Sequence, residues 1–143
     1  PVASAVALEN LRILEEENVI DHVRNVAGPA LKEMWHALGD HPLVGETTIV
    51  GMMASLALTP HKESRAKFAM EAGTAGFMCR ERSFANNLVM RHVYDRLVVS
   101  PPLVITPEEI AEMGRRAANR PQKQPSIKAL DSAVLSDAQR KTF

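Results

Sequence analysis

The sequence predicts one domain of mixed helices and strands. Its 143 residues and hydrophobic content of 45% suffice for a single packed core. Three stretches repeat apolar residues every three or four positions, as helices with one buried face do: 2–16, 18–38 and 74–85. Three others are apolar runs with β-branched residues, which favour strands: 47–58, 88–93 and 97–99.

The first two helices are predicted to follow each other closely. The helix over 2–16 ends at the charged run Glu15–Glu17, and the next begins near Asn18, a residue type that caps helix N-termini well. Asp21 falls in the first turn, where the helix dipole favours a negative charge. Gly28-Pro29 interrupts the apolar repeat. Because proline lacks the amide hydrogen that a helix interior needs, we expect a kink or a break there.

The middle of the chain is predicted to hold one long buried strand. Residues 47–58 lie between Gly45 and Pro60, and we expect a single strand with Gly51 inside it. A glycine at such a place marks a bulge or the close approach of another group. Residues 60–72 are polar and weakly periodic, so they predict a loop or a short helix.

A helix and two short strands should come next. The helix over 74–85 should end at Asn86-Asn87, because asparagine tolerates the left-handed backbone conformation of helix ends. The runs Leu88–Val93 and Leu97–Val99 predict two strands joined by a turn at Tyr94-Asp95-Arg96.

A capping box marks the last predicted helix. In the run 106–109, threonine caps the helix, proline suits the first helical position, and Glu109 can reach back to the cap. We expect this helix to continue at least through Met113. Gly114 and the prolines that follow do not support a longer helix, and residues 120–143 predict a polar, basic tail.

The charge distribution does not point to nucleic acid or a membrane as a partner of the whole chain. The formal net charge is zero, but residues 1–113 hold 10 Lys+Arg against 15 Asp+Glu, and residues 114–143 hold 7 against 2. The basic tail is a candidate for nucleic-acid binding. Because it lacks interleaved aromatic residues, a solvated tail is the preferred interpretation.

The chain carries no evident targeting segment. No apolar run reaches the length of a membrane span, and no signal peptide opens the sequence. Cys79 is the only cysteine, so no disulfide can form within the chain, which is compatible with the cytoplasm. Because the chain begins at Pro1 and enters a helical pattern at once, we expect a fragment or a processed chain.

Few residues stand out as candidates for chemistry. The five histidines do not pair at metal-ligand spacing with each other or with Cys79. Gly73 and Gly76 are interpreted as loop punctuation rather than as a phosphate-binding loop. Cys79 lies beside Arg80 and Arg82, whose charges favour a lower thiol pKa. Without an evident His or Asp partner, however, we interpret this cysteine as a small buried hydrophobe rather than a nucleophile.

Arg91 is the strongest candidate for a binding residue. It stands in the strand-like run LVMRHV among apolar neighbours, and its planar guanidinium suits a carboxylate bidentately. From the pattern alone an ion pair is the preferred interpretation, because structural ion pairs outnumber ligand sites. An exposed place at a sheet edge is the third possibility.

Three segments of the chain resemble a known enzyme family. The opening PVASAVALENLRILEEENVIDHV, the run TTIVGMMASLAL and, most specifically, CRERSFANNLVMRHVYDRLVVSPPLVITPEEIAEM are similar to class III aminotransferases. The last segment looks like the C-terminal signature of omega-transaminases that use pyruvate as amino acceptor. The resemblance covers residues 1–113 and implies a domain over that range, followed by a divergent basic tail over 114–143.

The resemblance implies a fold and an activity. The fold is α+β: the small C-terminal domain of pyridoxal-phosphate (PLP) enzymes of fold type I, a short antiparallel sheet with helices packed on one face. The parent enzyme would be a homodimeric, PLP-dependent transaminase that moves an amino group from an amine or amino acid to a keto acid such as pyruvate. The arginine that corresponds to Arg91 binds the substrate carboxylate and moves aside for an apolar amine.

Two departures from the family matter for this interpretation. The family usually has glycine at the position of Tyr94, so a tyrosine there is expected to strain the turn beside Arg91. The long amphipathic helix that usually follows Met113 is replaced by the basic tail.

The catalytic lysine of the family is not expected in this chain. The lysine that holds PLP covalently lies upstream in the family, and none of the six lysines present matches it: Lys32, Lys62, Lys67, Lys123, Lys128 and Lys141. We therefore expect the chain alone to bind no PLP and to be inactive. The alternative is a stand-alone interaction or dimerisation module, whose uncovered sheet face would pair with a partner or with itself.

Overall fold

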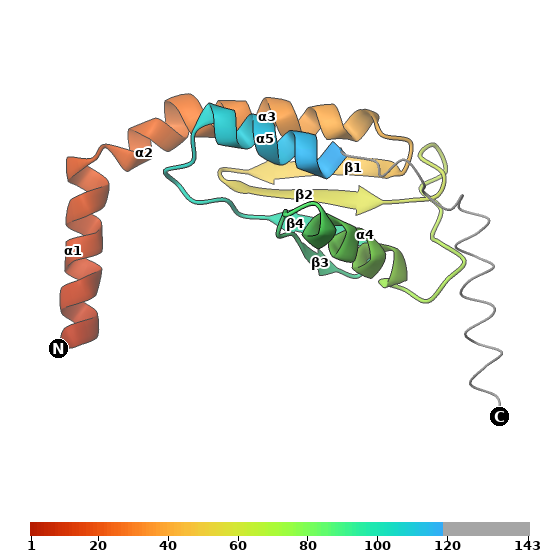
Figure 1. The fold of residues 1–143 in the computed structure, drawn as a ribbon, viewed down its shortest axis with the longest axis horizontal. Helices are drawn as coiled ribbons and strands as arrows, with labels where there is room; N and C mark the ends of the chain where they lie inside the picture. Colours follow the sequence, from red (N-terminus) through yellow and green to blue (C-terminus); the bar gives the residue numbers. More distant parts are fainter. Residues whose placement is uncertain (119–143) are drawn as a thin grey trace.

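The computed structural model describes residues 1–118, and residues 119–143 lie outside the described part. The elements follow in the order α1 (Val2–Glu16), α2 (Val19–His22), the π-helical turn η1 (Val23–Ala27), α3 (Gly28–Ala37), the 3-10 turn η2 (Leu38–Asp40), β1 (Val44–Val50), β2 (Met53–Leu58), α4 (Thr74–Ala85), β3 (Arg91–Val93), β4 (Arg96–Val99) and α5 (Pro107–Ala118) (Figure 1). The predicted α+β fold is confirmed.

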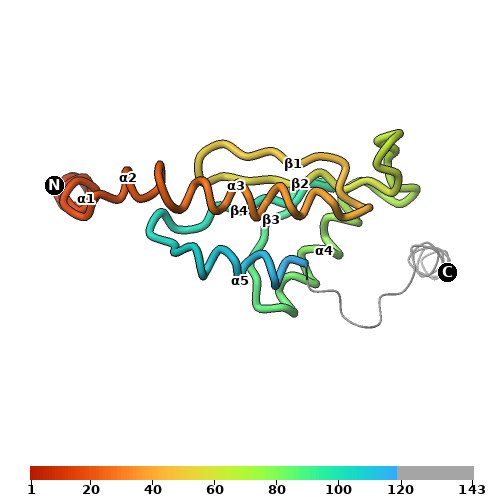
Figure 2. The backbone as a smooth tube through the Cα atoms, turned by 90° about the horizontal axis from the view of Figure 1, so that it is seen from above, coloured from red at the N-terminus to blue at the C-terminus, as the bar shows by residue number. Residues whose placement is uncertain are grey.

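The four strands form one antiparallel sheet in the order β1-β2-β4-β3, so β1 and β3 are its edges. Trp35 of α3, Cys79 of α4 and Met113 of α5 all pack against one hydrophobic cluster that includes Leu56 and Leu97 of the sheet. The helices therefore cover one face, as expected. We call the other the open face. In Figure 2, α3 lies between β1 and α5.

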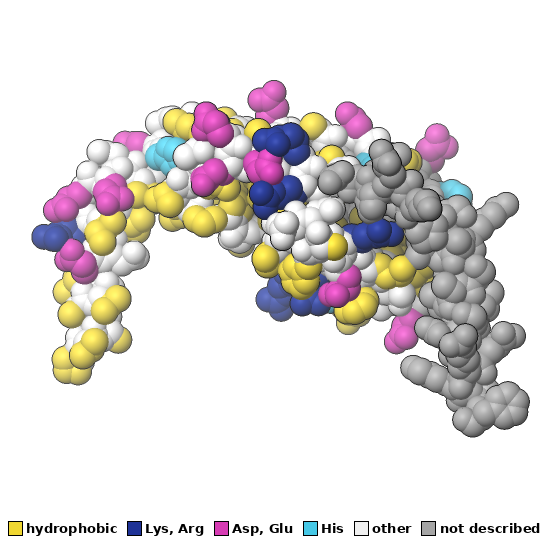
Figure 3. Space-filling model, viewed as in Figure 1, with side chains coloured by type: hydrophobic (Ala, Val, Ile, Leu, Met, Phe, Trp, Pro, Cys, Tyr) yellow, Lys and Arg dark blue, Asp and Glu magenta, His cyan; other side chains and the backbone are white. Residues whose placement is uncertain are grey.

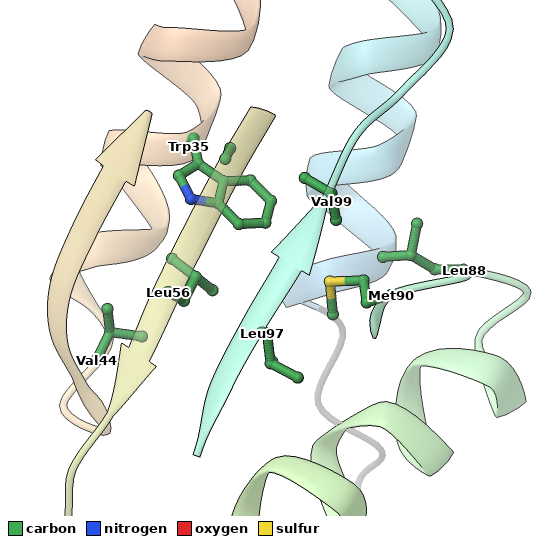
Figure 4. Packing of buried hydrophobic residues seen from close by; sticks show 8 residues of the cluster. Trp35, Val44, Leu56, Leu88, Met90, Leu97 and Val99 are labelled. Atoms are coloured by element: carbon green, nitrogen blue, oxygen red, sulfur yellow. The ribbon is translucent and has the colours of Figure 1, made fainter. Parts of the chain in front are cut away.

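Trp35 is the centre of the core. Its side chain is fully buried, and its indole nitrogen Nε1 donates a hydrogen bond to the carbonyl oxygen of Ser55 at 2.9 Å. Figure 4 shows it gathered with Leu56, Leu97 and Val99 over the strands. Because a buried donor without a partner is costly, this bond fixes α3 over β2 as well as filling the core.

The prediction of one strand over 47–58 is wrong, because this segment forms the β1–β2 hairpin. Val50 pairs with Met53 across a two-residue turn at Gly51-Met52, and Gly51 has the left-handed φ of 57° that such turns favour. The turn is not visible in the sequence because its apolar residues differ in burial. Val50 and Met53 are 67% and 59% exposed, whereas Met52 is buried against the helices.

The predicted interruption at Gly28-Pro29 takes the form of a π-helical turn. Residues 19–37 are helical throughout, and η1 comes directly before Gly28. A wider turn accommodates a proline, which cannot donate a backbone hydrogen bond. Gly28 is needed at the junction, because a Cβ there would lie 2.6 Å from the carbonyl oxygen of Val23.

The predicted capping box is confirmed at the start of α5. The Thr106 backbone N–H donates to Glu109 Oε2 at 2.9 Å, and the Glu109 N–H donates to Thr106 Oγ1 at 3.3 Å. The helix continues past Met113 to Ala118, through the buried Gly114. Gly114 is therefore a packing position within the helix and does not end it. The division of the chain at residue 113 remains a prediction, and the predicted tail over 120–143 lies outside the described residues.

Helix α1 stands apart from the sheet domain. None of its residues is buried, and it joins the rest of the chain through α2 (Figures 1 and 2). Several of its exposed side chains are large and apolar: Val2, Val6, Leu8, Leu11 and Ile13. Figure 3 shows this apolar surface along the helix. Within residues 1–118, no helix combines the length and apolar character needed to cross a membrane.

Candidate substrate-carboxylate site

Arg91 is the first residue of β3, at the free edge of the sheet. Side chains alternate between the two faces along a strand, and directly paired residues share a face. The pairing of Arg91 with Val98, of Val98 with Ser55 and of Ser55 with Thr48 makes one row across the open face. Arg91 therefore projects from the face that the helices leave uncovered.

A second arginine on the open face, Arg96, is bound by its neighbours. Arg96 pairs with Val93 and Ala57, in the row next to that of Arg91. Its Nη1 donates to Ser55 Oγ at 3.0 Å, and its Nη2 forms an ion pair with Glu46 Oε2 at 3.2 Å. The sequence pattern favoured an ion pair for Arg91, but the ion pair on this face is formed by Arg96.

Arg91 itself makes no ion pair or side-chain hydrogen bond with any residue of the described range 1–118, and its side chain is exposed. A guanidinium in this position has all its donors available. On the same face, the nearest carboxylate in the neighbouring row, Glu46, is already held by Arg96. Among the described residues, the arrangement leaves the cation of Arg91 on the open face available to an incoming anion.

The start of α4 holds the hairpin that carries Arg91. The Gly76 N–H donates to Asp95 Oδ1 at 3.1 Å, in the turn between β3 and β4. Gly76 has to be glycine, because a Cβ would lie 2.0 Å from the carbonyl oxygen of Tyr94. The Phe77 ring packs edge-on against His92, with centroids 5.9 Å apart. The interpretation as loop punctuation holds for Gly73, which ends the loop before α4 with a left-handed φ of 93°. It is wrong for Gly76, which lies inside α4 and allows the close approach of helix and turn.

The expected strain at Tyr94 has a structural basis. Tyr94 adopts a left-handed φ of 50° in the turn, where a side chain is disfavoured and glycine is not. Tyr94 is 73% exposed, so the packing of its side chain offsets little of that cost. The turn keeps its geometry because the β3–β4 pairing and α4 hold it from two sides.

Cys79 is a core residue and not an activated thiol. Burial raises the pKa of its thiol, and the opposing charge of Arg82 is the smaller influence. Arg80 is directed elsewhere, to Glu81 at 3.1 Å and over the ring of Phe84. The sulfur side chain packs against the hydrophobic cluster under the sheet, as the preferred interpretation expected.

The described residues form no candidate metal site, and their lysines are in solvent. Among residues 1–118 there is no group of three or more His, Cys, Asp or Glu side chains arranged to hold a metal ion. Lys32, Lys62 and Lys67 are all exposed, and the Lys62 ammonium donates to the carbonyl oxygen of Gly39 at 2.5 Å. A lysine that binds PLP has to be desolvated beside a ring-binding pocket, so these three do not fit that role.

Comparisons with known proteins give a consistent identity. No family model matches the chain. It is 50% identical over 113 residues to the putrescine–pyruvate aminotransferase of Pseudomonas aeruginosa, covering 79% of this chain and 24% of that enzyme. The omega-transaminase of Pseudomonas jessenii in complex with PMP has the same fold, with a TM-score of 0.77 and 32% identity over 95% of this chain and 28% of that one. A transaminase solved with L-alanine matches at a TM-score of 0.74 and 31% identity, over 100% of this chain and 30% of that one.

These matches are long and include both sequence and fold, but the chain spans only about a quarter of the length of the proteins that it matches. The motifs within residues 1–113 indicate the same family, and the sheet and helices have the predicted arrangement. The chain is a small-domain fragment of a class III aminotransferase, of the type to which the omega-transaminases belong.

Proposed function

We propose that the enzyme of which this chain is a segment is a PLP-dependent transaminase, which moves an amino group from an amine or amino acid to a keto acid such as pyruvate. The observation that carries this proposal is the guanidinium of Arg91 on the open face, which has no partner within residues 1–118, beside an Arg96 that is held by Ser55 and Glu46. The names of the matched proteins support the substrate class: one is a putrescine–pyruvate aminotransferase, and another was solved with L-alanine.

Arg91 is proposed to bind the substrate carboxylate. Its planar donors match the two carboxylate oxygens, and this geometry orients the substrate as well as holding it. Because the side chain is exposed and bonded to nothing within residues 1–118, it can turn away when an apolar amine occupies the same place. PLP, held by the remainder of the enzyme, carries the amino group between the two substrates.

Substitutions in the full-length enzyme test this role. Arg91→Ala should raise KM for pyruvate and for alanine roughly ten- to hundredfold, the worth of a charge-assisted hydrogen-bond pair of about 1.5–3 kcal/mol. KM for an arylalkyl amine should change little. Arg96→Lys is the matched control, since it alters an arginine of the same face and keeps a cation beside Glu46. Equal losses for pyruvate and for the amine in Arg91→Ala would refute the proposal.

The isolated chain is proposed to be inactive and to hold no PLP. The exposed positions of Lys32, Lys62 and Lys67 support this. Mixing the purified chain with PLP, reducing with borohydride and measuring the intact mass with peptide mapping tests it. No stoichiometric adduct is expected. One specific adduct on a single lysine would show that the chain has a cofactor site of its own.

We also propose that the parent enzyme is a cytoplasmic homodimer. The single cysteine of the chain, which is half-buried and unpaired, supports a reducing compartment. The exposed apolar side chains of α1 favour a partner surface, and they equally support the alternative of a stand-alone interaction or dimerisation module. Sedimentation of the full-length enzyme and of the chain separates these: a dimer that forms only in the full-length enzyme disfavours the module.

A further inference from the structure

We infer that Asp95 is a positioning residue for Arg91, which acts by fixing the β3–β4 hairpin to the start of α4. This inference rests on the proposed carboxylate-binding role of Arg91. It concerns how the protein holds that arginine in place, through a contact of Asp95 with the backbone of α4.

Strand β3 needs support from outside the sheet. It has three residues and pairs with β4 alone, because it is an edge strand. A short strand with one neighbour is easily displaced, since few backbone hydrogen bonds hold it. Arg91 is the first residue of β3, so any shift or rotation of the strand moves the guanidinium directly.

The support comes from the first turn of α4, through three contacts that we call the α4 clamp. The Asp95 carboxylate accepts the Gly76 N–H at 3.1 Å. The backbone of Tyr94 lies directly against Gly73 and Gly76. The ring of Phe77 packs on His92, the neighbour of Arg91 in β3. The clamp therefore contacts the strand and the turn, and only one of its contacts depends on a charged side chain.

The electrostatics of Asp95 suit this role. Its carboxylate satisfies an N–H at the start of a helix, where the helix dipole favours negative charge. No ion pair joins Asp95 to Arg91 within the described residues, although they lie in the same hairpin. The acidic group thus orders the turn while the cation of Arg91 stays available for a substrate anion.

Kinetics of the full-length enzyme test the inference. Asp95→Ala should raise KM for pyruvate about tenfold, because a displaced binding group loses its alignment with the carboxylate, and KM for an arylalkyl amine should stay nearly unchanged. Asp95→Asn keeps an acceptor oxygen for the Gly76 N–H and should restore most of the affinity. Phe77→Leu loosens the clamp at a half-exposed position and should give a smaller rise.

Thr106→Ala is the matched control. It removes a side-chain acceptor from the start of another helix, α5, so it imposes a comparable loss of capping without touching the β3–β4 hairpin. Its KM for pyruvate should equal that of the unaltered enzyme. Circular dichroism and thermal unfolding of each variant show whether it is folded. If Asp95→Ala does not fold, the comparison rests on Asp95→Asn and Phe77→Leu.

A double substitution separates this inference from the proposed function. If Asp95 acts through Arg91, adding Asp95→Ala to Arg91→Ala should give no further rise in KM for pyruvate. Full additivity, or a rise as large in Thr106→Ala, would overturn the positioning role while leaving Arg91 as the carboxylate ligand. An Arg91→Ala enzyme with unchanged KM for pyruvate would overturn the proposed function and this inference with it.

Discussion

Gly114→Ala tests how closely α5 packs on α3. At an open helical position alanine is favoured over glycine by about 1 kcal/mol. Gly114 is buried, however, and a Cβ there would lie 2.6 Å from Met34 Cγ and 2.9 Å from Met34 Sδ. Overpacking a filled site costs about 1–3 kcal/mol. The methionine is flexible, so a middle cost of ~2 kcal/mol less the propensity gain leaves a net destabilisation of about 1 kcal/mol.

The assay is urea unfolding of the purified chain, followed by the fluorescence of Trp35. This is the only tryptophan of the chain and it is fully buried, so its emission reports the loss of the core. Ala111→Gly, at an exposed position of the same helix, measures the propensity difference alone. In a Met34→Ala background the contact disappears, and Gly114→Ala should then stabilise the chain by about 1 kcal/mol. The same gain in the unaltered background would refute the described packing.

Three further predictions concern other parts of the chain. Tyr94→Gly should stabilise the chain by about 0.5 kcal/mol in the same unfolding assay. Glycine removes the strain of the left-handed φ of 50°, and the higher conformational entropy of the unfolded chain offsets part of that gain. Cys79 should react with Ellman's reagent at pH 8 about tenfold or more slowly than free cysteine, since burial raises the pKa of its thiol. The hydrogen bond from Arg116 lowers the pKa of Glu112. This contact should therefore persist at mildly acidic pH and be lost as the pH falls through the lowered pKa. In an NMR titration, the midpoint of Glu112 should rise in Arg116→Ala.

Much of the fold follows from local signals in the sequence. The capping box of α5 and the left-handed Asn87 after α4 are short-range features, and each residue type does in the structure what its chemistry favours. The β1–β2 hairpin could not be found in this way. Met52 is apolar because the turn packs under α3 and α5, and Val50 is apolar although it is exposed. No polar residue therefore stands at the turn to mark it.

The candidate site was only partly accessible from sequence. Arg91 was found through its residue type and the motif around it, and its availability depends on which residues the sheet brings beside it. The role of Gly76 depends on a turn that lies 19 residues further along the chain. One local signal for Gly76 did exist. A glycine inside a helix lowers its stability by about 1 kcal/mol relative to alanine, so a glycine within the predicted helix 74–85 indicates the close approach of other atoms.

The contrast between Arg91 and Arg96 shows how register decides which arginine is available. Both lie on the open face, on adjacent strands. The row of Arg96 ends at Glu46, whereas the row of Arg91 consists of the uncharged Val98, Ser55 and Thr48. A slip of β3 by two residues would place Arg91 directly beside Arg96, where like charges repel. The contacts that hold β3 in register, above all those of the α4 clamp, therefore also determine whether Arg91 is free to bind an anion.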